Sequence, residues 1–125
     1  MDALADAVDA GRTRAVGVCN YNVEQSIRAE AALAERGVPL ASNQVEFSLL
    51  HRAPERNGLL ELCQNRGITL IAYSPIAQGI LTGKYSAKAP PPGPRGRRFT
   101  REYLLRVQPL LGLMKEIGQG HGKKT

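Results

Sequence analysis

The chain has 125 residues, of which 42% are hydrophobic and 22% are charged, with 13 glycines and 8 prolines. This composition is typical of a single soluble globular unit, and it excludes a disordered or collagen-like chain. Two cysteines are too few for a disulfide framework or a cysteine-built zinc site, and no secretory leader is seen, so we expect an intracellular, reducing compartment and no metal. No apolar run approaches the roughly 20 residues of a membrane helix, so we expect no membrane partner.

The net charge of +6 is unevenly distributed. Residues 1–82 carry 7 basic and 9 acidic side chains, whereas residues 83–125 carry 10 basic and 2 acidic ones. Few aromatic residues lie between the basic ones, although a surface that stacks nucleic-acid bases would need them. A small phosphate-bearing ligand explains such a local patch as well as a polynucleotide does.

Helix and strand patterns alternate from the first residues onward. Residues 2–11 start with an aspartate and stop at a glycine, which is typical of a helix end, and we expect that helix to begin upstream. The apolar run at residues 14–18 predicts a short strand. Asn22, followed three residues later by Gln25, then predicts a capping box and a helix that ends at Gly37.

The same order is repeated in the next segment. Residues 41–45 predict a second strand, and Pro54 suits the first turn of a helix that ends at Gly67. Residues 68–72 predict a third strand. Strands that alternate with helices favour a parallel sheet, either open or closed into a barrel. Residues 17–20 carry neither a G-x-G-x-x-G fingerprint nor a P-loop, which favours the barrel.

A proline- and glycine-rich segment follows the third strand. Residues 89–96 cannot continue a helix or a central strand, so we predict a Pro/Gly/Arg-rich loop over residues 84–99. Thr100 then caps a helix in which Pro109 predicts a kink. The apolar face of this helix is formed by Tyr103, Val107, Leu110, Leu111, Met114 and Ile117, and its end is predicted at Gly118, Gly120 and Gly122.

Polar or aromatic residues stand where each predicted strand ends, at the edge where parallel sheets place their sites. Asn20 and Gln44 each carry an amide that both donates and accepts, which suits a planar carboxamide ligand; alternatively, each bonds neighbouring backbone. Tyr73 offers a ring face for stacking, or it packs in the rim of the sheet. Residues 74–79 have the composition of a phosphate-wrapping turn, or of a plain strand-to-helix turn. Lys84 and Arg95 favour phosphate.

The remaining reactive side chains receive no catalytic role. Cys19 and Cys63 are predicted to be small buried hydrophobes. His51 and His121 are predicted to be solvated, because two histidines so far apart do not define a site. Glu46 lacks a partner that would tune a general base, so a structural hydrogen bond is expected.

Four segments together resemble the aldo-keto reductase family, in its order and spacing and over nearly the whole chain. They are residues 17–21 (Gly-Val-Cys-Asn-Tyr), 41–50 (Ala-Ser-Asn-Gln-Val-Glu-Phe-Ser-Leu-Leu), 70–79 (Leu-Ile-Ala-Tyr-Ser-Pro-Ile-Ala-Gln-Gly) and 81–85 (Leu-Thr-Gly-Lys-Tyr). Residues 91–97 and 100–102 further resemble a plant branch with members in plastids. The resemblance thus allows a cytoplasmic or chloroplast location.

The resemblance implies a (β/α)8 TIM barrel that reduces aldehydes and ketones with NADP(H), and small-molecule carbonyl substrates. It assigns Asn20 and Gln44 to the nicotinamide carboxamide, Tyr73 to the nicotinamide ring, and Arg95 to the adenosine phosphate side. Cys19 replaces the serine usual in the family, which implies weaker carboxamide anchoring. The expected pyrophosphate contacts are Ser74, Pro75, Ile76, Ala77, Gln78, Gly79 and Lys84.

The family barrel has eight strands and about 250 residues, so we expect residues 1–125 to form a partial domain. By motif order the predicted βα units hold strands five to seven, plus a following helix. The family's catalytic Asp, Tyr, Lys and His would lie upstream, so no catalytic residue is assigned. We therefore expect a fragment of an NADPH-dependent oxidoreductase. The alternative is a non-catalytic remnant or regulatory subunit that binds NADP(H) or a partner barrel. A nucleic-acid module comes a distant third, because only the basic C-terminal part supports it, and we expect no nucleic-acid partner.

Overall fold

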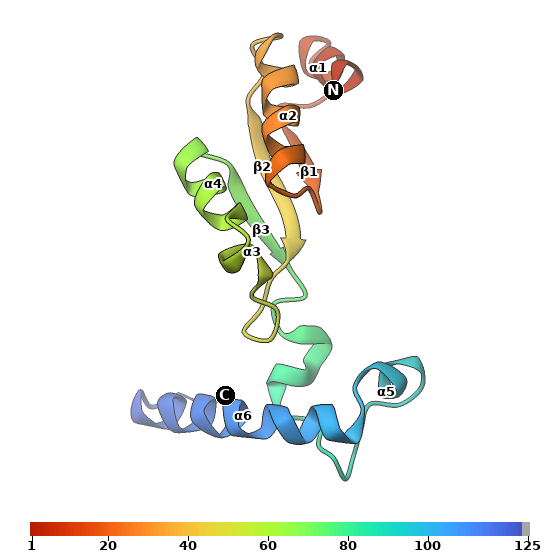
Figure 1. Ribbon diagram of the computed structural model, residues 1–125, viewed down its shortest axis with the longest axis vertical. Helices are drawn as coiled ribbons and strands as arrows, with labels where there is room; N and C mark the ends of the chain where they lie inside the picture. The colour runs from red at the N-terminus through yellow and green to blue at the C-terminus, as the bar shows by residue number, and fades with distance from the viewer. Residues whose placement is uncertain (124–125) are drawn as a thin grey trace. The chain divides into compact units, whose positions relative to one another are not determined.

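The computed structural model describes residues 1–123, and the chain divides into two compact units, Met1–Pro75 and Ile76–Thr125 (Figure 1). Composition predicted one unit. The hydrophobic core cluster consists of residues from Ala5 to Ile68. The buried side chains that follow residue 75, such as Ile80 and Leu104, are not members of that cluster.

The first unit alternates helices and strands in the predicted order. Its elements are α1 (Asp2–Asp9), β1 (Val16–Cys19), α2 (Val23–Ala34), β2 (Leu40–Glu46), α3 (Ala53–Arg56), α4 (Leu59–Arg66) and β3 (Thr69–Tyr73). The strands form a parallel sheet of three strands in the order β1-β2-β3. Each predicted strand is present, displaced by one or two residues at its ends.

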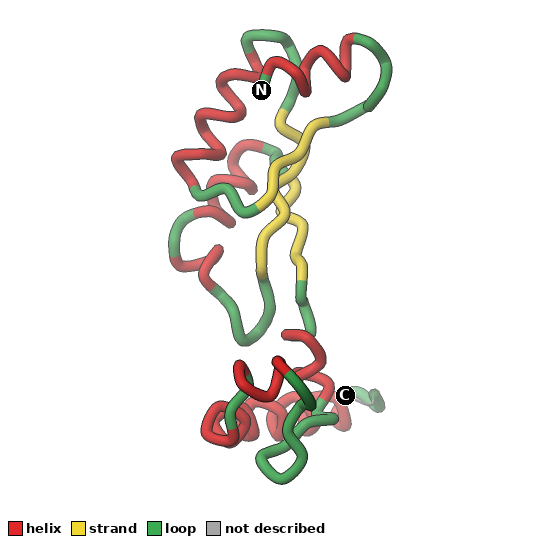
Figure 2. The backbone as a smooth tube through the Cα atoms, turned by 90° about the vertical axis from the view of Figure 1, so that its right-hand side faces the viewer, coloured by secondary structure: helices red, strands yellow, loops and turns green. Residues whose placement is uncertain are grey.

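Helices α2, α3 and α4 lie on one side of the sheet and leave the other side uncovered (Figure 2). Val16, Val18 and Val45 face the helices and are buried, with 3 to 9% of their surface exposed. Leu33 of α2 and Leu59 of α4 complete the apolar layer between helices and strands. Burial of this layer stabilises the sheet by the hydrophobic effect.

Local signals explain where the helices begin and end. The predicted capping box is confirmed: the side chain of Asn22 accepts from the backbone N–H of Gln25 at 2.8 Å, and that of Gln25 accepts from Asn22 at 3.0 Å. Gly67 ends α4 with a left-handed φ of 66°, as predicted. The single helix predicted after Pro54 was wrong, because Gly58, at φ 80°, separates α3 from α4.

The second unit contains a 3-10 helix, η1 (Ala77–Thr82), and two α-helices, α5 (Pro94–Arg98) and α6 (Arg101–Gly120). The loop prediction was wrong for α5, because Pro94 stands at the start of that helix, where its fixed φ and missing N–H are tolerated. The Thr100 cap is confirmed by a 3.3 Å hydrogen bond from the backbone N–H of Tyr103.

Helix α6 continues through Pro109 and ends at Gly120, within the glycine-rich end predicted over residues 118–122. The N–H of Lys123 bonds the Gly118 carbonyl at 2.7 Å, and Gly122 is left-handed at φ 65°, a Schellman-type end. The predicted apolar face is only partly buried: Val107 is 4% exposed, but Ile117 is 54% exposed. Within residues 1–123, no helix is long and apolar enough to span a membrane.

Candidate functional site

The uncovered face of the sheet carries most of the predicted side chains of the first unit. Cys19 pairs with Gln44, which pairs with Ile71, and Glu46 pairs with Tyr73. Register partners in neighbouring strands share a face, so these side chains form two adjacent rows. Gln44 is exposed and Tyr73 is half-buried. The sheet thus presents an amide and a phenol ring near the carboxyl ends of its strands.

The two cysteines have different environments. The prediction that Cys19 is buried was wrong, because its position in β1 places it on the uncovered face, where it is exposed. Cys63 lies in the core and is 1% exposed. This burial raises the pKa of the Cys63 thiol by desolvation, which leaves Cys63 less thiolate than a solvated cysteine would have.

Asn20 lies directly after β1 in a left-handed conformation, with φ at 58°. Its backbone N–H donates to the carbonyl of Gln44 at 2.8 Å. This hydrogen bond extends the ladder between the first two strands by one residue beyond β1. The two amide-bearing residues that the sequence predicted are therefore joined directly through their backbones.

A cleft of about 230 Å³ lies at the same end of the sheet, and it brings Asn20 and Tyr73 together. Glu46 lines it as well, while Gln44 does not. The sequence prediction missed Asn57, which also lines the cleft and whose Oδ1 accepts from the N–H of Leu59, the first residue of α4, at 3.1 Å. The Asn-Gly pair at residues 57–58, a turn signal, was the clue available in the sequence.

Four residues other than glycine have a positive φ within residues 1–123: Asn20 at 58°, Ser74 at 53°, Ala77 at 48° and Gln78 at 55°. All four belong to the set that the sequence assigned to the cofactor. Left-handed backbone costs about 1–2 kcal/mol for a residue with a Cβ atom, and such strain concentrates at ligand sites.

In the second unit, Lys84 lies across Gly79. A Cβ atom on Gly79 would come within 3.0 Å of Cε and 3.3 Å of Nζ of Lys84. The ammonium group of Lys84 is 4.9 Å from the ring centroid of Tyr85, and the Gly79 carbonyl accepts from the Thr82 hydroxyl at 2.8 Å. The structure therefore brings together two residues of the predicted pyrophosphate loop. Arg95 lies on α5 and is exposed.

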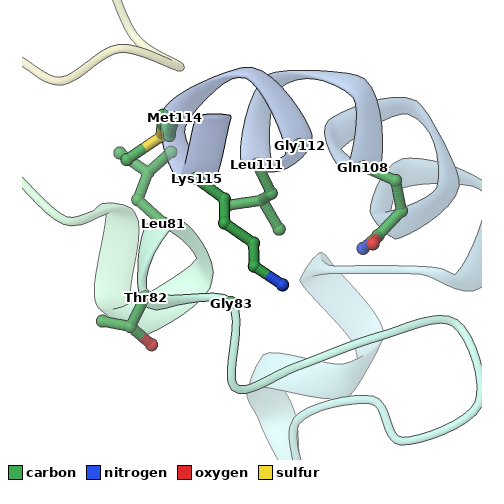
Figure 3. Close-up of a pocket in the computed structure, with 8 residues that line it drawn as sticks. All are labelled: Leu81, Thr82, Gly83, Gln108, Leu111, Gly112, Met114 and Lys115. Atoms are coloured by element: carbon green, nitrogen blue, oxygen red, sulfur yellow. The ribbon is translucent and has the colours of Figure 1, made fainter. Parts of the chain in front are cut away.

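A second hollow, of about 380 Å³, lies between η1 and α6 (Figure 3). The side chains of Leu81, Leu111 and Met114 supply apolar atoms, and Lys115 and Gln108 supply polar ones. No residue of the predicted cofactor set lines it. Among residues 1–123, no group of three or more His, Cys, Asp or Glu side chains is placed to hold a metal ion.

Comparison with known proteins assigns the chain to a family. The model of the Aldo/keto reductase family matches residues 1–125. The chain belongs to this family. Its resemblance to the family, inferred from the four sequence segments, is thereby confirmed, and its α/β fold with a parallel sheet of three strands is similar to that of a family member.

Individual relatives cover the chain but extend well beyond it. The chain is 44% identical over 122 residues to a chloroplastic pyridoxal reductase of Arabidopsis thaliana, covering 98% of this chain and 33% of the relative. It is 42% identical over 83 residues to L-glyceraldehyde 3-phosphate reductase of Escherichia coli K12, covering 66% of this chain and 24% of the relative. A crystal structure of the thermostable aldo-keto reductase Tm1743 with the inhibitor epalrestat matches at a TM-score of 0.62 and 29% identity, covering 97% of this chain and 34% of that one.

The chain thus spans about a third of the length of these two relatives, the Arabidopsis reductase and Tm1743, which match nearly all of it.

Proposed function

We propose that this chain supplies the nicotinamide and pyrophosphate side of an NADP(H) site in an aldo/keto reductase that reduces aldehydes or ketones. The observation that carries the proposal is that the four non-glycine residues with left-handed backbone within residues 1–123, Asn20, Ser74, Ala77 and Gln78, all belong to the cofactor set that the family resemblance implies. Under this proposal, the three strands correspond to barrel strands five, six and seven.

In the first unit, Asn20 and Gln44 would bind the carboxamide, because each amide can both donate and accept. Tyr73 would lie against the nicotinamide ring, whose reduced form supplies the hydride for carbonyl reduction. The hydrogen bond between the backbones of Asn20 and Gln44 keeps these residues at adjacent positions. Cys19, next to Asn20, offers only a weak thiol donor, so we expect Cys19→Ser in a full-length reductase not to weaken NADPH binding.

In the second unit, the left-handed backbone of Ala77 and Gln78 fits an anion, because successive turned peptides form concavities that gather N–H groups. The continuous segment Ser74 to Gly79, whose first two residues end the first unit, would contact the pyrophosphate, with Ser74 supplying a hydroxyl group. Lys84 supplies a positive charge beside Gly79, and the absence of a Cβ atom there leaves room for its side chain. Arg95 would serve the adenosine phosphate.

The substrates would be small carbonyl compounds, and the compartment would be the cytoplasm or the chloroplast, as the name of the Arabidopsis relative suggests. None of the residues 1–125 is assigned a catalytic role. The alternative is a non-catalytic protein that binds NADP(H) or a partner barrel. The two are separated in a full-length reductase that contains this chain: loss of NADPH absorbance with an aldehyde would favour the enzyme, and NADPH binding without turnover would favour the alternative. Residues 1–125 by themselves should not turn over, and reduction of an aldehyde by this chain alone would contradict the proposal.

The binding test is an NMR titration of the ¹⁵N-labelled full chain with NADPH. We expect shifts at Asn20 and Gln44 and weaker binding by Asn20→Ala and Gln44→Ala. Gln64→Ala is the matched control, because Gln64 is an exposed amide on α4. Equal weakening by the control, or no shift at the sheet end, would contradict the proposal.

A further inference from the structure

A buried amide stands next to the proposed carboxamide site and has no role in it so far. Asn43 of β2 is 0% exposed and precedes Gln44 in the strand. Strand alternation turns its side chain to the helix-covered side, away from that of Gln44. An apolar residue would occupy this core position without burying a polar group. The side chain of Asn43 therefore requires an explanation in terms of its hydrogen bonds.

The amide nitrogen of Asn43 contacts the turn after β1 and the first turns of α2. It donates to the carbonyl of Tyr21 at 2.9 Å and to the hydroxyl of Ser26 at 3.1 Å. The Ser26 hydroxyl in turn donates to the carbonyl of Asn22 at 2.8 Å. A carbonyl can only accept, so the NH₂ group of Asn43 must face Tyr21, and the direction of this chain of hydrogen bonds is fixed.

The oxygen of the Asn43 side-chain amide is in an unfavourable environment. This Oδ1 atom is buried and has no hydrogen-bond partner within residues 1–123. Buried polar atoms are rarely left unpaired, and each such atom destabilises the fold. An asparagine at this position is thus explained by what its NH₂ group holds, which is the carbonyl of Tyr21, the residue that directly follows Asn20.

We propose that Asn43 is a positioning residue for Asn20: its hydrogen bond to the Tyr21 carbonyl holds the left-handed turn at the end of β1 that orients Asn20. The turn is held at both residues, since the Asn20 N–H bonds the Gln44 carbonyl at 2.8 Å and the carbonyl of the next residue, Tyr21, accepts from Asn43. Two consecutive residues of β2 thus fix the turn. The identity of the ligand, NADPH, rests on the proposed function, whereas the role of Asn43 in holding the turn at Asn20 does not depend on it.

The first test is structural and needs no ligand. In the labelled full chain, the left-handed φ of Asn20 gives a strong NOE between its own amide and Hα protons. We expect this NOE to weaken in Asn43→Ala and to persist in Ser26→Ala. The serine variant is the matched control, because it also removes a buried hydrogen bond of Asn43 but leaves the Tyr21 contact in place. An NOE that persists in both variants, or is lost in both, would overturn the proposal.

The second test separates positioning from general destabilisation. We expect Asn43→Ala to raise the Kd for NADPH about ten-fold, the equivalent of one hydrogen bond. Its Kd for inorganic pyrophosphate, read at Lys84, should stay unchanged, as should both constants in Ser26→Ala. A parallel loss of NADPH and pyrophosphate affinity in Asn43→Ala would overturn the positioning role.

Failure of the proposed function gives a different result. If NADPH shifts neither Asn20 nor Gln44 in the unmodified chain, the cofactor assignment fails, and the NOE comparison still decides the role of Asn43. If Asn43→Ala does not fold, hydrogen exchange in the unmodified chain tests the same hydrogen bonds. The side-chain NH₂ protons of Asn43 should exchange slowly with solvent and show NOEs to Ser26. Rapid exchange with solvent would overturn the proposal.

Discussion

Replacement of Gln78 by glycine is expected to stabilise the second unit, although glycine usually weakens a helix. Gln78 lies within η1 with φ 55° and ψ 29°, a left-handed conformation, and its side chain is exposed. Removing that side chain therefore sacrifices little packing. It also removes the Cβ atom, which is the source of strain in left-handed backbone.

Two opposing contributions set the magnitude. Relief of the left-handed strain is worth about 1–2 kcal/mol. The greater freedom of glycine in the unfolded chain offsets about 0.5–1 kcal/mol of this gain. The net expectation for Gln78→Gly is an increase of up to about 1.5 kcal/mol in the free energy of unfolding. The control Gln64→Gly, in the right-handed helix α4 and also exposed, should instead lose about 1 kcal/mol.

Urea unfolding provides the assay, with each variant followed through the amide resonances of the unit that carries the substitution. Opposite signs for Gln78→Gly and Gln64→Gly support the strain at Gln78. The added flexibility should also weaken pyrophosphate binding, so that stability and affinity change in opposite directions. A loss of stability in Gln78→Gly equal to that in Gln64→Gly would refute the reasoning.

Three further outcomes are expected. Iodoacetamide should alkylate Cys19 rapidly, and Cys63 only when the first unit unfolds, because burial keeps its thiol protonated and covered; mass spectrometry of early time points that shows both modified equally would contradict this. Hydrogen bonds from its own backbone N–H and from the Thr100 hydroxyl lower the pKa of Glu102. The stability that ionised Glu102 adds to α6 is therefore fully present above its pKa in the unfolded chain, about 4.3, and is lost as the pH falls through its lower pKa in the folded chain. Circular dichroism should show that the helix content of Glu102→Gln depends less on pH over this range. Finally, a Cβ atom on Gly17 would clash with Oγ of Ser42. Thermal unfolding should show Gly17→Ala to be destabilising by about 1–3 kcal/mol and partly rescued by Ser42→Ala, whereas additive effects of the two substitutions would argue against the contact.

The sequence predicted the α/β order because its signals were local. The capping pair of Asn22 and Gln25 and the terminal glycine at 67 act through neighbouring backbone, so the residue types alone carry the information. Two local signals were misinterpreted. Asn57-Gly58 interrupts a helix that was predicted as continuous, and Pro94 starts a helix where only a loop was expected.

The candidate site was predictable where side-chain chemistry stands at strand ends, as at Asn20 and Tyr73. The left-handed backbone of Ala77 and Gln78 was not, because neither residue type favours that conformation and only the surrounding fold imposes it. Asn43 was missed for a similar reason. Its partner Ser26 is 17 residues away in the chain, and nothing in the sequence indicates that the two side chains meet.

The strand order β1-β2-β3 follows the order of the chain, and paired residues are only about 25 residues apart. Every pairing is therefore made between successive elements, which keeps the contact order of this sheet low for a parallel one and favours rapid formation. During synthesis on the ribosome, β2 can join β1 before β3 has emerged. The left-handed turn at Asn20 can accordingly form as soon as β2 is in place, ahead of the rest of the site.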